Sequence, residues 1–241
     1  MTKYSYDLHI HSCLSPCADD DMTPANIAGM AAVSGLILLA LTDHNTCKNC
    51  PAFFKACKAY GIVPIAGMEL TTSEEIHMVC LFPTLEDAMN FDSEIDKHRM
   101  KVKNKKEIFG NQLIMDSEDN VIGEEENLLI FATDLAIDDA YALVKKFGGA
   151  AYPAHIDRES NGIIAILGNM PTEPEFRFVE YNDAENEAEY TEKYGLHGKG
   201  KLVCSDAHNL WSINEAVNFI EIDDEPYSSD RVRRQFIGML G

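Results

Sequence analysis

The chain has 241 residues, of which 46% are hydrophobic and 25% charged, the balance of an ordinary globular protein with room for one barrel-sized domain. It contains no run of 18 apolar residues and no apolar leader after Met1, so we expect no contact with a membrane and a cytoplasmic location. The net charge of −20 disfavours a nucleic acid polymer as partner and leaves a small phosphorylated substrate, attracted by bound metal, as the expected ligand.

Strand-like and helix-like segments alternate along the chain. Thr23-Pro24 is a helix start and Gly35 a helix stop, and the continuous apolar run at 36–42 is typical of a strand buried on both faces. The strands predicted in this way lie at 4–10, 36–42, 62–70, 76–82, 150–154, 176–181, 201–204 and 217–222. Helices are predicted at 24–34, 51–60, from 84 onward, at 137–147 and near the C-terminus. Repeated strand–helix units predict an α/β fold, either a parallel barrel or a doubly wound sheet, in one domain over 1–241.

The pattern loosens between about 96 and 127. A lysine cluster at 97–106 is followed by an acidic stretch at 116–126, with little apolar periodicity. We interpret this segment as an exposed insertion of helix and loop. Its lysines are typical of a solvated helix face, with a substrate lid as the alternative.

Histidines and carboxylates gather at the predicted strand ends, where catalytic residues of such folds belong. His9 and His11 form a His-x-His pair on the first strand, and residues two apart on a strand point to the same face. The other members of the set are Asp43 and His44 after the second strand, Glu69 on the third, His77 on the fourth, His155, and Asp206 and His208. Each pattern alone is weak, but the combination predicts a metal site.

The order of these motifs resembles that of the polymerase-and-histidinol-phosphatase (PHP) superfamily. The matching stretches are Asp7-Leu-His-Ile-His11, Leu41-Thr-Asp-His-Asn45, Gly67-Met-Glu69, His77, Pro153-Ala-His155 and Ser205-Asp-Ala-His208. The resemblance implies a distorted (β/α)7 barrel with two to three divalent ions, such as Zn, Mn or Fe, at its mouth. It also implies phosphoesterase activity on a small-molecule phosphate ester, with a metal-activated hydroxide as the nucleophile.

The resemblance also implies which residues hold each ion. His9, His11, Glu69 and Asp206 would hold the first, and Glu69 would bridge to a second bound by His77 and His155. His44 and His208 would hold a third. Glu69, Asp206 and Asp43 are thus expected to take part in catalysis. Asp43 and His44 point in opposite directions on a strand, so we expect His44 to be the ligand and Asp43 to orient it.

The segment after the His-x-His pair departs from the family pattern. Many members have Ser-Asp-Gly there, whereas Ser15 is followed here by Pro16-Cys17-Ala18 and three aspartates. The last ligand of the third ion is therefore open among Cys17, Asp19 and Asp20, and the aspartates also suit a solvated loop. Two cysteine pairs, Cys13-x3-Cys17 and Cys47-x2-Cys50, are either packed small residues or a second zinc or iron–sulfur site.

Arg158 follows His155 closely and is the best candidate to bind a phosphate, with a surface ion pair to Asp157 or Glu159 as the alternative. His98 and His197 match no motif and are expected on the surface. Two other functions remain alternatives to the phosphoesterase: an amidohydrolase-like metal hydrolase and a non-catalytic PHP module.

Overall fold

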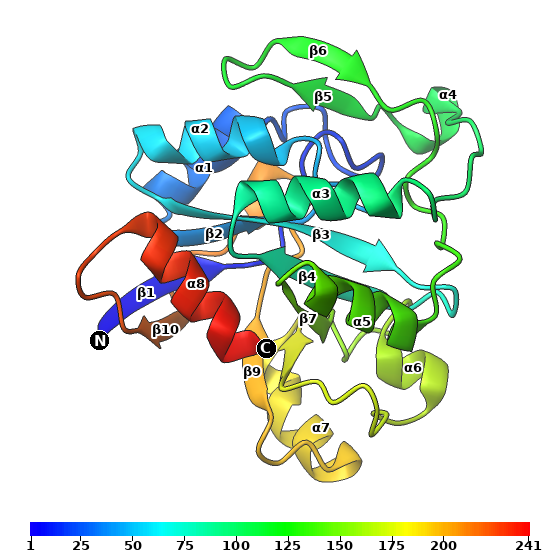
Figure 1. Ribbon diagram of the computed structural model, residues 1–241, viewed down its shortest axis with the longest axis vertical. Coiled ribbons are helices and arrows are strands. Elements are labelled where there is room, and N and C mark those ends of the chain that lie inside the picture. The colour runs from blue at the N-terminus through cyan, green and yellow to red at the C-terminus, as the bar shows by residue number, and fades with distance from the viewer.

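The computed structural model describes residues 1–241 and contains ten strands and eight α-helices (Figure 1). The strands are β1 Thr2–Asp7, β2 Leu38–Leu41, β3 Val63–Thr71, β4 His77–Phe82, β5 Leu113–Met115, β6 Val121–Glu124, β7 Ala150–Pro153, β8 Phe178–Tyr181, β9 Gly200–Val203 and β10 Phe219–Ile222. The helices are α1 Pro24–Val33, α2 Cys50–Ala59, α3 Leu85–Ile95, α4 Lys106–Phe109, α5 Ile137–Lys146, α6 Ile163–Leu167, α7 Glu187–Tyr194 and α8 Ser229–Leu240. None of these helices is long and apolar enough to cross a membrane.

The main sheet has the order β10-β1-β2-β3-β4-β7 and curls toward the parallel pair β8-β9. Single backbone hydrogen bonds continue the curl at both seams: the Ile156 amide donates to the Glu180 carbonyl (2.8 Å), and the His11 amide donates to the Ala207 carbonyl (3.0 Å). Seven strands, β1 to β4 and β7 to β9, therefore surround one axis. This arrangement confirms the distorted barrel predicted from the sequence.

The fourth strand runs against its neighbours. β3 and β4 are joined by the short turn 72–76 and pair antiparallel, with Thr71 opposite His77. A turn this short can join two antiparallel strands, whereas two parallel strands need a longer connection, usually a helix. The expectation of a purely parallel barrel is therefore wrong at β4. Because of the reversal, the first residue of β4 lies beside the last residue of β3. His77 thus reaches the barrel mouth from the beginning of a strand.

Alternating side chains of the strands divide the core into two layers. Leu39 and Leu41 of β2 belong to the layer beneath the outer helices, whereas Leu38 and Ala40 face the barrel interior. Phe236 of α8 packs into the interior layer, and Figure 1 shows this helix lying across the strands. Strands buried on both faces explain why the apolar run at 36–42 is unbroken.

The segment 96–127 is a β-hairpin, β5-β6, preceded by the single helical turn α4, rather than a helix and loop. It packs on loops at the mouth instead of projecting freely. The Leu113 amide donates to the Cys13 carbonyl (2.9 Å), and the Met115 amide donates to Asn49 Oδ1 (2.9 Å). Four of the cluster's lysines lie in ion pairs with acidic neighbours within the segment or on α3: Lys97, Lys101, Lys103 and Lys106.

Candidate metal centre

The segment that follows β1 presents two imidazoles to the barrel mouth. Ile10, which lies between the two histidines in sequence, forms a parallel bridge with Ala207, and the ring centroids of His9 and His11 lie 5.2 Å apart. Both histidine side chains are fully buried. The sequence prediction that this pair acts together is therefore matched by its geometry.

Glu69, near the end of β3, and Asp206, which follows β9, complete a four-residue group with this pair. The Nε2 atoms of His9 and His11 lie 3.2 Å apart, and Glu69 Oε1 is 3.3 Å from that of His9. Asp206 Oδ1 is 3.3 Å from His9 Nε2 and 3.1 Å from His11 Nε2. These four ligand atoms all lie within 4.8 Å of one another, a spacing compatible with a single ion.

Glu69 is the centre of a wider cluster. Its Oε1 lies 2.7 Å from His77 Nδ1 and 3.1 Å from His155 Nε2, and its Oε2 lies 2.9 Å from His44 Nδ1. Because the two oxygens face different histidines, this carboxylate has the arrangement of a bridging ligand. His44, Glu69 and His77 form a second group of ligand atoms within 4.8 Å.

His208 lies on the other side of His11, with the two rings stacked at a centroid distance of 4.2 Å. His11, His44 and His208 form a third group within 4.8 Å. The three groups overlap and together contain five histidines. His155, whose Nε2 lies 3.1 Å from Glu69 Oε1, brings the centre to six of the eight. The two remaining histidines, His98 and His197, lie away from it in ion pairs with Asp134 and Glu192.

The nitrogen and oxygen atoms of the cluster converge on one region, and some of them have no hydrogen-bond partner. His44 Nδ1, His77 Nδ1 and Asp206 Oδ1 are buried and have no hydrogen-bond partner, although a nitrogen or oxygen of a neighbour lies within 3.1 Å of each. Buried polar atoms without a partner are costly, and converging lone pairs of imidazole and carboxylate are the donor set of Zn, Mn and Fe. The residues therefore fit divalent metal ions.

A layer of hydrogen bonds behind the cluster orients the ligands. Glu180 of β8 accepts a 2.7 Å hydrogen bond from His9 Nδ1, which leaves His9 Nε2 to face the centre. Ser15 donates to Asp43 (2.8 Å) and accepts from His11 Nδ1 (2.9 Å), which has the same effect on His11. Sequence reasoning missed Glu180, and the only signal for it was one acidic residue in an apolar strand.

Asp43 does not enter the cluster itself. Its carboxylate accepts hydrogen bonds from the Ser12 amide (2.7 Å), the Ser12 hydroxyl (2.6 Å) and the Ser15 hydroxyl. The Ser15 oxygen also accepts from the His44 amide at 3.1 Å. Asp43 therefore positions both His11 and His44 through Ser15, and does not touch reacting atoms as a catalytic residue would.

Two cluster residues adopt backbone conformations that are rare for residues other than glycine. His155 has φ 28° and Asp206 has φ 50°. Such conformations cost free energy and persist where the surrounding structure imposes them, most often at functional sites. At the mouth, the fold thus places these two side chains at the cost of a strained local backbone.

The charges of the cluster are strongly coupled. Burial alone would lower the pKa of the histidines, but the carboxylates of Glu180, Asp206 and Glu69 outweigh it and hold the pKa of His9 well above its usual value. For His11, Asp206 and Glu69 likewise overcome burial and raise the pKa to about 9. Burial opposes the ionised forms of Glu69 and Asp206, yet the histidines hold both pKa values well below the usual range. The carboxylates of this centre are thus poised to stabilise positive charge.

The three candidates for the last ligand lie in different surroundings. Cys17 is exposed, and its side chain approaches His44. The Asp19 amide donates to the His208 carbonyl, while Asp20 accepts from Asn111 of the hairpin segment (2.8 Å). Cys17 thus places its side chain beside a histidine of the cluster, whereas the Asp20 carboxylate is engaged by Asn111.

No cysteine belongs to the three groups of ligand atoms that lie within 4.8 Å of one another. Cys13 points to the Leu113 carbonyl, whereas Cys47 and Cys50 are buried beside the Gly67 carbonyl of β3. Burial raises the pKa of the Cys47 thiol well above its usual value. The four cysteines thus lie in three separate places.

Arg158 pairs with Asp206, and not with Asp157 or Glu159. Asp157 is engaged elsewhere, because its carboxylate accepts from the amides of Asn182 and Asp183. Arg158 also lines the mouth cavity, which has a volume of about 140 Å³ and no hydrophobic lining residue. The complete lining is His44, Glu69, His77, His155, Arg158, Ser160, Asn161, Asp206 and His208.

A curled α/β sheet with histidines and carboxylates at its mouth defines the class of metal-dependent hydrolases with a barrel-like fold. The chain belongs to the PHP domain family, whose model matches residues 7–194. The family predicted from the sequence motifs is thereby confirmed.

Two curated relatives share part of the sequence. The chain is 39% identical over 84 residues to a 5'-3' exoribonuclease of Haemophilus influenzae, covering 34% of this chain and 29% of the relative. It is 36% identical over 74 residues to an error-prone DNA polymerase of Symbiobacterium thermophilum, covering 31% and 7%. The chain thus spans less than a third of either relative.

Solved structures resemble the whole chain in fold. The endonuclease Q of Pyrococcus furiosus has a TM-score of 0.66 at 19% identity, over 100% of this chain and 57% of that one. A putative metal-dependent phosphoesterase of Bifidobacterium adolescentis has a TM-score of 0.59 at 16% identity, over 98% and 96%. An amidohydrolase of Chromobacterium violaceum, with bound sulfate, has a TM-score of 0.60 at 19% identity, over 91% and 92%.

These relatives overturn the expectation about partners drawn from net charge. An endonuclease Q structure holds a 27-mer DNA duplex, and the curated relatives are named as an exoribonuclease and a DNA polymerase. The expectations of a small phosphorylated substrate and of no nucleic acid partner are therefore wrong. Net charge misled because it averages over the whole surface and does not describe the local environment of the polar mouth cavity.

Proposed function

We propose that this protein is a metal-dependent hydrolase that cleaves phosphoester bonds in nucleic acid. The observation that carries the proposal is the mouth cavity: its lining is wholly polar, its donors converge, and its volume is about 140 Å³. Pockets that enclose a small ligand usually measure roughly 300–1,000 Å³. A cavity of this size admits a phosphate group, while the rest of the substrate lies outside it, as suits a polymer.

The proposed ligand sets combine the family resemblance with the groups of ligand atoms, and include His155 because its Nε2 lies 3.1 Å from Glu69 Oε1. His9, His11, Glu69 and Asp206 would hold a first ion, and Glu69 would share a second with His77 and His155. His44 and His208 would hold a third, beside His11. We propose two to three ions of Zn, Mn or Fe, because imidazole and carboxylate donors suit all three.

Such ions supply a Lewis acid for the phosphoryl group and lower the pKa of bound water toward 7. The chain's own residues do the positioning. Glu180 and Ser15 hold the two ring nitrogens of His9 and His11 toward the centre. Arg158, 44% exposed and beside Asp206, is placed to donate to phosphate oxygens that enter the cavity.

Cleavage assays of the metal-loaded protein test this function. Single-stranded RNA, single-stranded DNA, duplex DNA, a phosphomonoester and an amide would be compared, with metal content measured by elemental analysis. We expect two to three equivalents of metal and cleavage of at least one nucleic acid. Metal content below one equivalent after incubation with Mn or Zn, or turnover confined to the amide or the phosphomonoester, would contradict the proposal.

The variant Glu69→Gln links the activity to the cluster. It keeps the shape of the side chain but removes the charge that faces His9, His44 and His77, so metal content and turnover should fall by orders of magnitude. Glu75→Gln is the matched control, because Glu75 lies exposed in the turn that follows β3. Equal effects of the two substitutions would remove Glu69 from the centre.

A further inference from the structure

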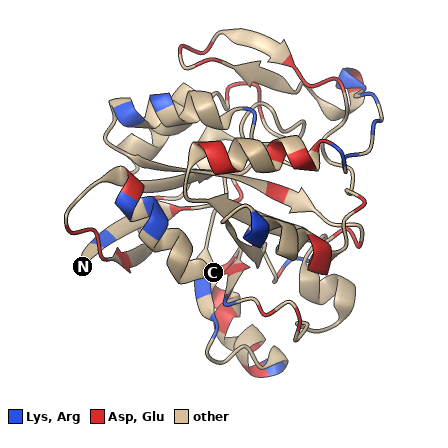
Figure 2. Ribbon diagram, in the orientation of Figure 1, with Lys and Arg blue, Asp and Glu red and all other residues tan.

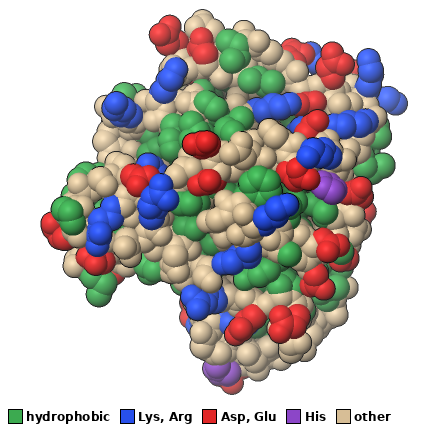
Figure 3. Space-filling model, viewed as in Figure 1, with side chains coloured by type: hydrophobic (Ala, Val, Ile, Leu, Met, Phe, Trp, Pro, Cys, Tyr) green, Lys and Arg blue, Asp and Glu red, His purple; other side chains and the backbone are tan.

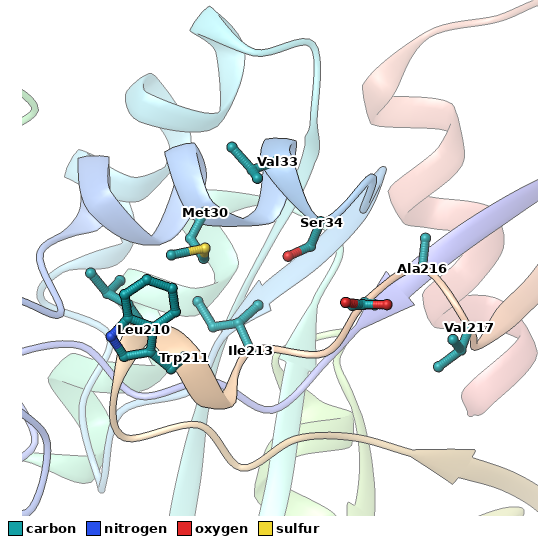
Figure 4. Close-up of a pocket in the computed structure, with 9 residues that line it drawn as sticks. Met30, Val33, Ser34, Leu210, Trp211, Ile213, Ala216 and Val217 are labelled. Atoms are coloured by element: carbon teal, nitrogen blue, oxygen red, sulfur yellow. The ribbon is translucent and has the colours of Figure 1, made fainter.

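A groove with mostly apolar walls lies beside the metal centre, and the proposed function does not use it. It has a volume of about 580 Å³ and lies between α1 and residues 210–217. Figure 4 shows Leu210 and Trp211 at one end of the groove and Ala216 and Val217 at the other. Seven of its nine lining residues are hydrophobic, and the only charged one is Glu215.

Trp211 is the most conspicuous residue of this groove. It is the chain's only tryptophan, and its side chain is 89% exposed. A large aromatic side chain left in water gives up the free energy of burial, so it contributes little to the fold. The surrounding turn is nevertheless fixed, because Asn209 Oδ1 accepts hydrogen bonds from the Ser212 amide (3.0 Å) and hydroxyl (2.9 Å).

The turn continues directly from the metal centre. His208, whose ring stacks on His11, lies three residues before Trp211, and three residues span at most about 10 Å of backbone. His208 is itself anchored, because its Nδ1 lies 2.7 Å from the Asp206 carbonyl oxygen and its own carbonyl accepts from the Asp19 amide. This connection thus keeps the backbone of Trp211 within about 10 Å of that of His208, which lines the mouth cavity.

We propose that Trp211 stacks on a nucleobase of the strand whose phosphate occupies the mouth cavity. This inference rests on the proposed function. The cavity holds a phosphate but not a nucleoside, so the adjoining sugar and base must lie on the surface beside it. An indole stacks on any base, and stacking requires no cation, which suits a chain with a net charge of −20.

A protein partner fits this groove less well. Stable protein interfaces bury about 800 Å² and roughly 20–30 residues on each side. The groove is lined by only nine residues, from one helix and one loop, which is fewer than such an interface needs. Association of two copies through this groove would be detected by analytical ultracentrifugation.

Intrinsic fluorescence reports on the proposed contact directly, since all tryptophan emission comes from Trp211. Metal-loaded protein would be mixed in a stopped-flow instrument with a single-stranded oligonucleotide that it cleaves, and with an abasic oligonucleotide of equal length. Stacking predicts quenching by the first within the binding phase and little change with the second. Equal quenching by both, or binding of the first without quenching, would overturn the inference.

Substitutions give a second, independent measurement. Trp211→Ala should lower kcat/KM for oligonucleotides about tenfold through KM, and Trp211→Phe should recover most of the loss, because stacking is worth roughly 1–3 kcal/mol per base. Tyr227→Ala is the control, since Tyr227 is also exposed (59%) but lines a different groove, beside Phe54 and Arg233.

The outcomes separate the inference from the proposed function. If the wild-type protein cleaves no nucleic acid, the proposed function fails. If it does and Trp211→Ala has unchanged kinetics, only the stacking role fails. A Trp211→Ala variant that changes from dimer to monomer in analytical ultracentrifugation, with oligonucleotide KM unchanged, would assign the groove to self-association instead.

Discussion

Ring orientation in this centre depends on residues that never face the substrate. A neutral imidazole can bind a metal through one nitrogen only if its other nitrogen carries the proton. Glu180 fixes that proton on His9 Nδ1, and its Oε1 also accepts from the His155 amide at 3.2 Å. One buried carboxylate therefore contacts two cluster histidines, one after β1 and one after β7.

Replacing Glu180 by Gln tests this role. The amide oxygen keeps the hydrogen bond, but the negative charge is lost and an NH2 group replaces Oε2, which has no partner in the core. We expect metal affinity to fall roughly 10–100-fold, as other changes behind metal ligands do. Competition with a chelator would measure it, and Glu221→Gln on the exposed side of β10 should leave the affinity unchanged.

Arg158 is expected to act on substrate rather than on metal. Its loss as Arg158→Ala removes a charge-assisted contact of roughly 1.5–3 kcal/mol, so kcat/KM should fall about tenfold to a hundredfold. Arg158→Lys should recover part of this, because an ammonium lacks the planar fork. Metal content should remain that of the wild type. Unchanged steady-state kinetics in Arg158→Ala would contradict a role of Arg158 in binding the phosphate.

At the scale of single residues, the sequence indicated which residues lie near strand ends better than it indicated which residues they contact. His9, His11 and Glu69 were identifiable because the period of a strand and the position of a strand end are local properties. The pairing of Arg158 with Asp206 rather than Asp157 depends on where β9 ends relative to β7, which no local pattern encodes. Ser15 and Glu180 escaped prediction for the same reason, because Ser15 donates to Asp43, 28 residues away, and Glu180 accepts from His9, 171 residues away.

At the scale of elements, the hairpin segment supports the mouth through one close backbone contact. Gly110 has φ 93° and ψ 179°, a conformation almost confined to glycine. A Cβ at this position would lie 2.4 Å from the Pro16 carbonyl oxygen, in the loop that brings Cys17 to His44. The hairpin therefore approaches this loop more closely than any side chain permits.

Gly110→Ala should consequently destabilise the protein by roughly 2–5 kcal/mol, from backbone strain together with the clash, and should lower turnover by displacing the loop. Gly148→Ala is the matched control. Gly148 also has a positive φ (74°), but a Cβ there would meet nothing within 4 Å, so only the strain of about 1–2 kcal/mol applies. Denaturant unfolding of the two variants would compare them, and equal losses would show that the contact with Pro16 is unimportant.

The elements themselves were predictable where their signals are local. Thr23 and Thr84 cap α1 and α3 as their sequences indicate, each accepting from an amide three residues on. The reversal of β4 was not predictable, because strand direction depends on which edge of the sheet is free. The β5-β6 hairpin was also missed, since its strands are three and four residues long and owe their order to contacts with Cys13 and Asn49.

At the scale of the whole molecule, charge is spread rather than patterned. Figure 2 shows acidic residues on most helices and loops, and on the face in Figure 3 acidic and basic side chains are interspersed. No surface of a single basic sign is available to guide a nucleic acid strand over that face. For the nucleic acid substrate proposed above, this face offers no attraction, and the net charge of −20 gives a repulsive long-range field.

This balance predicts an unusual dependence on salt. Proteins that bind nucleic acid through lysine and arginine lose affinity steeply as salt increases. Here added salt should first screen the repulsion, since the Debye length falls from about 30 Å at 0.01 M to about 10 Å at 0.1 M. We expect kcat/KM for a 20-mer oligonucleotide to rise over that interval at saturating metal, and to rise less for a dinucleotide, which carries fewer phosphates. Initial rates in KCl would measure both. A steep fall for the 20-mer from the lowest salt onward would instead show that a basic surface outside the mouth binds the strand.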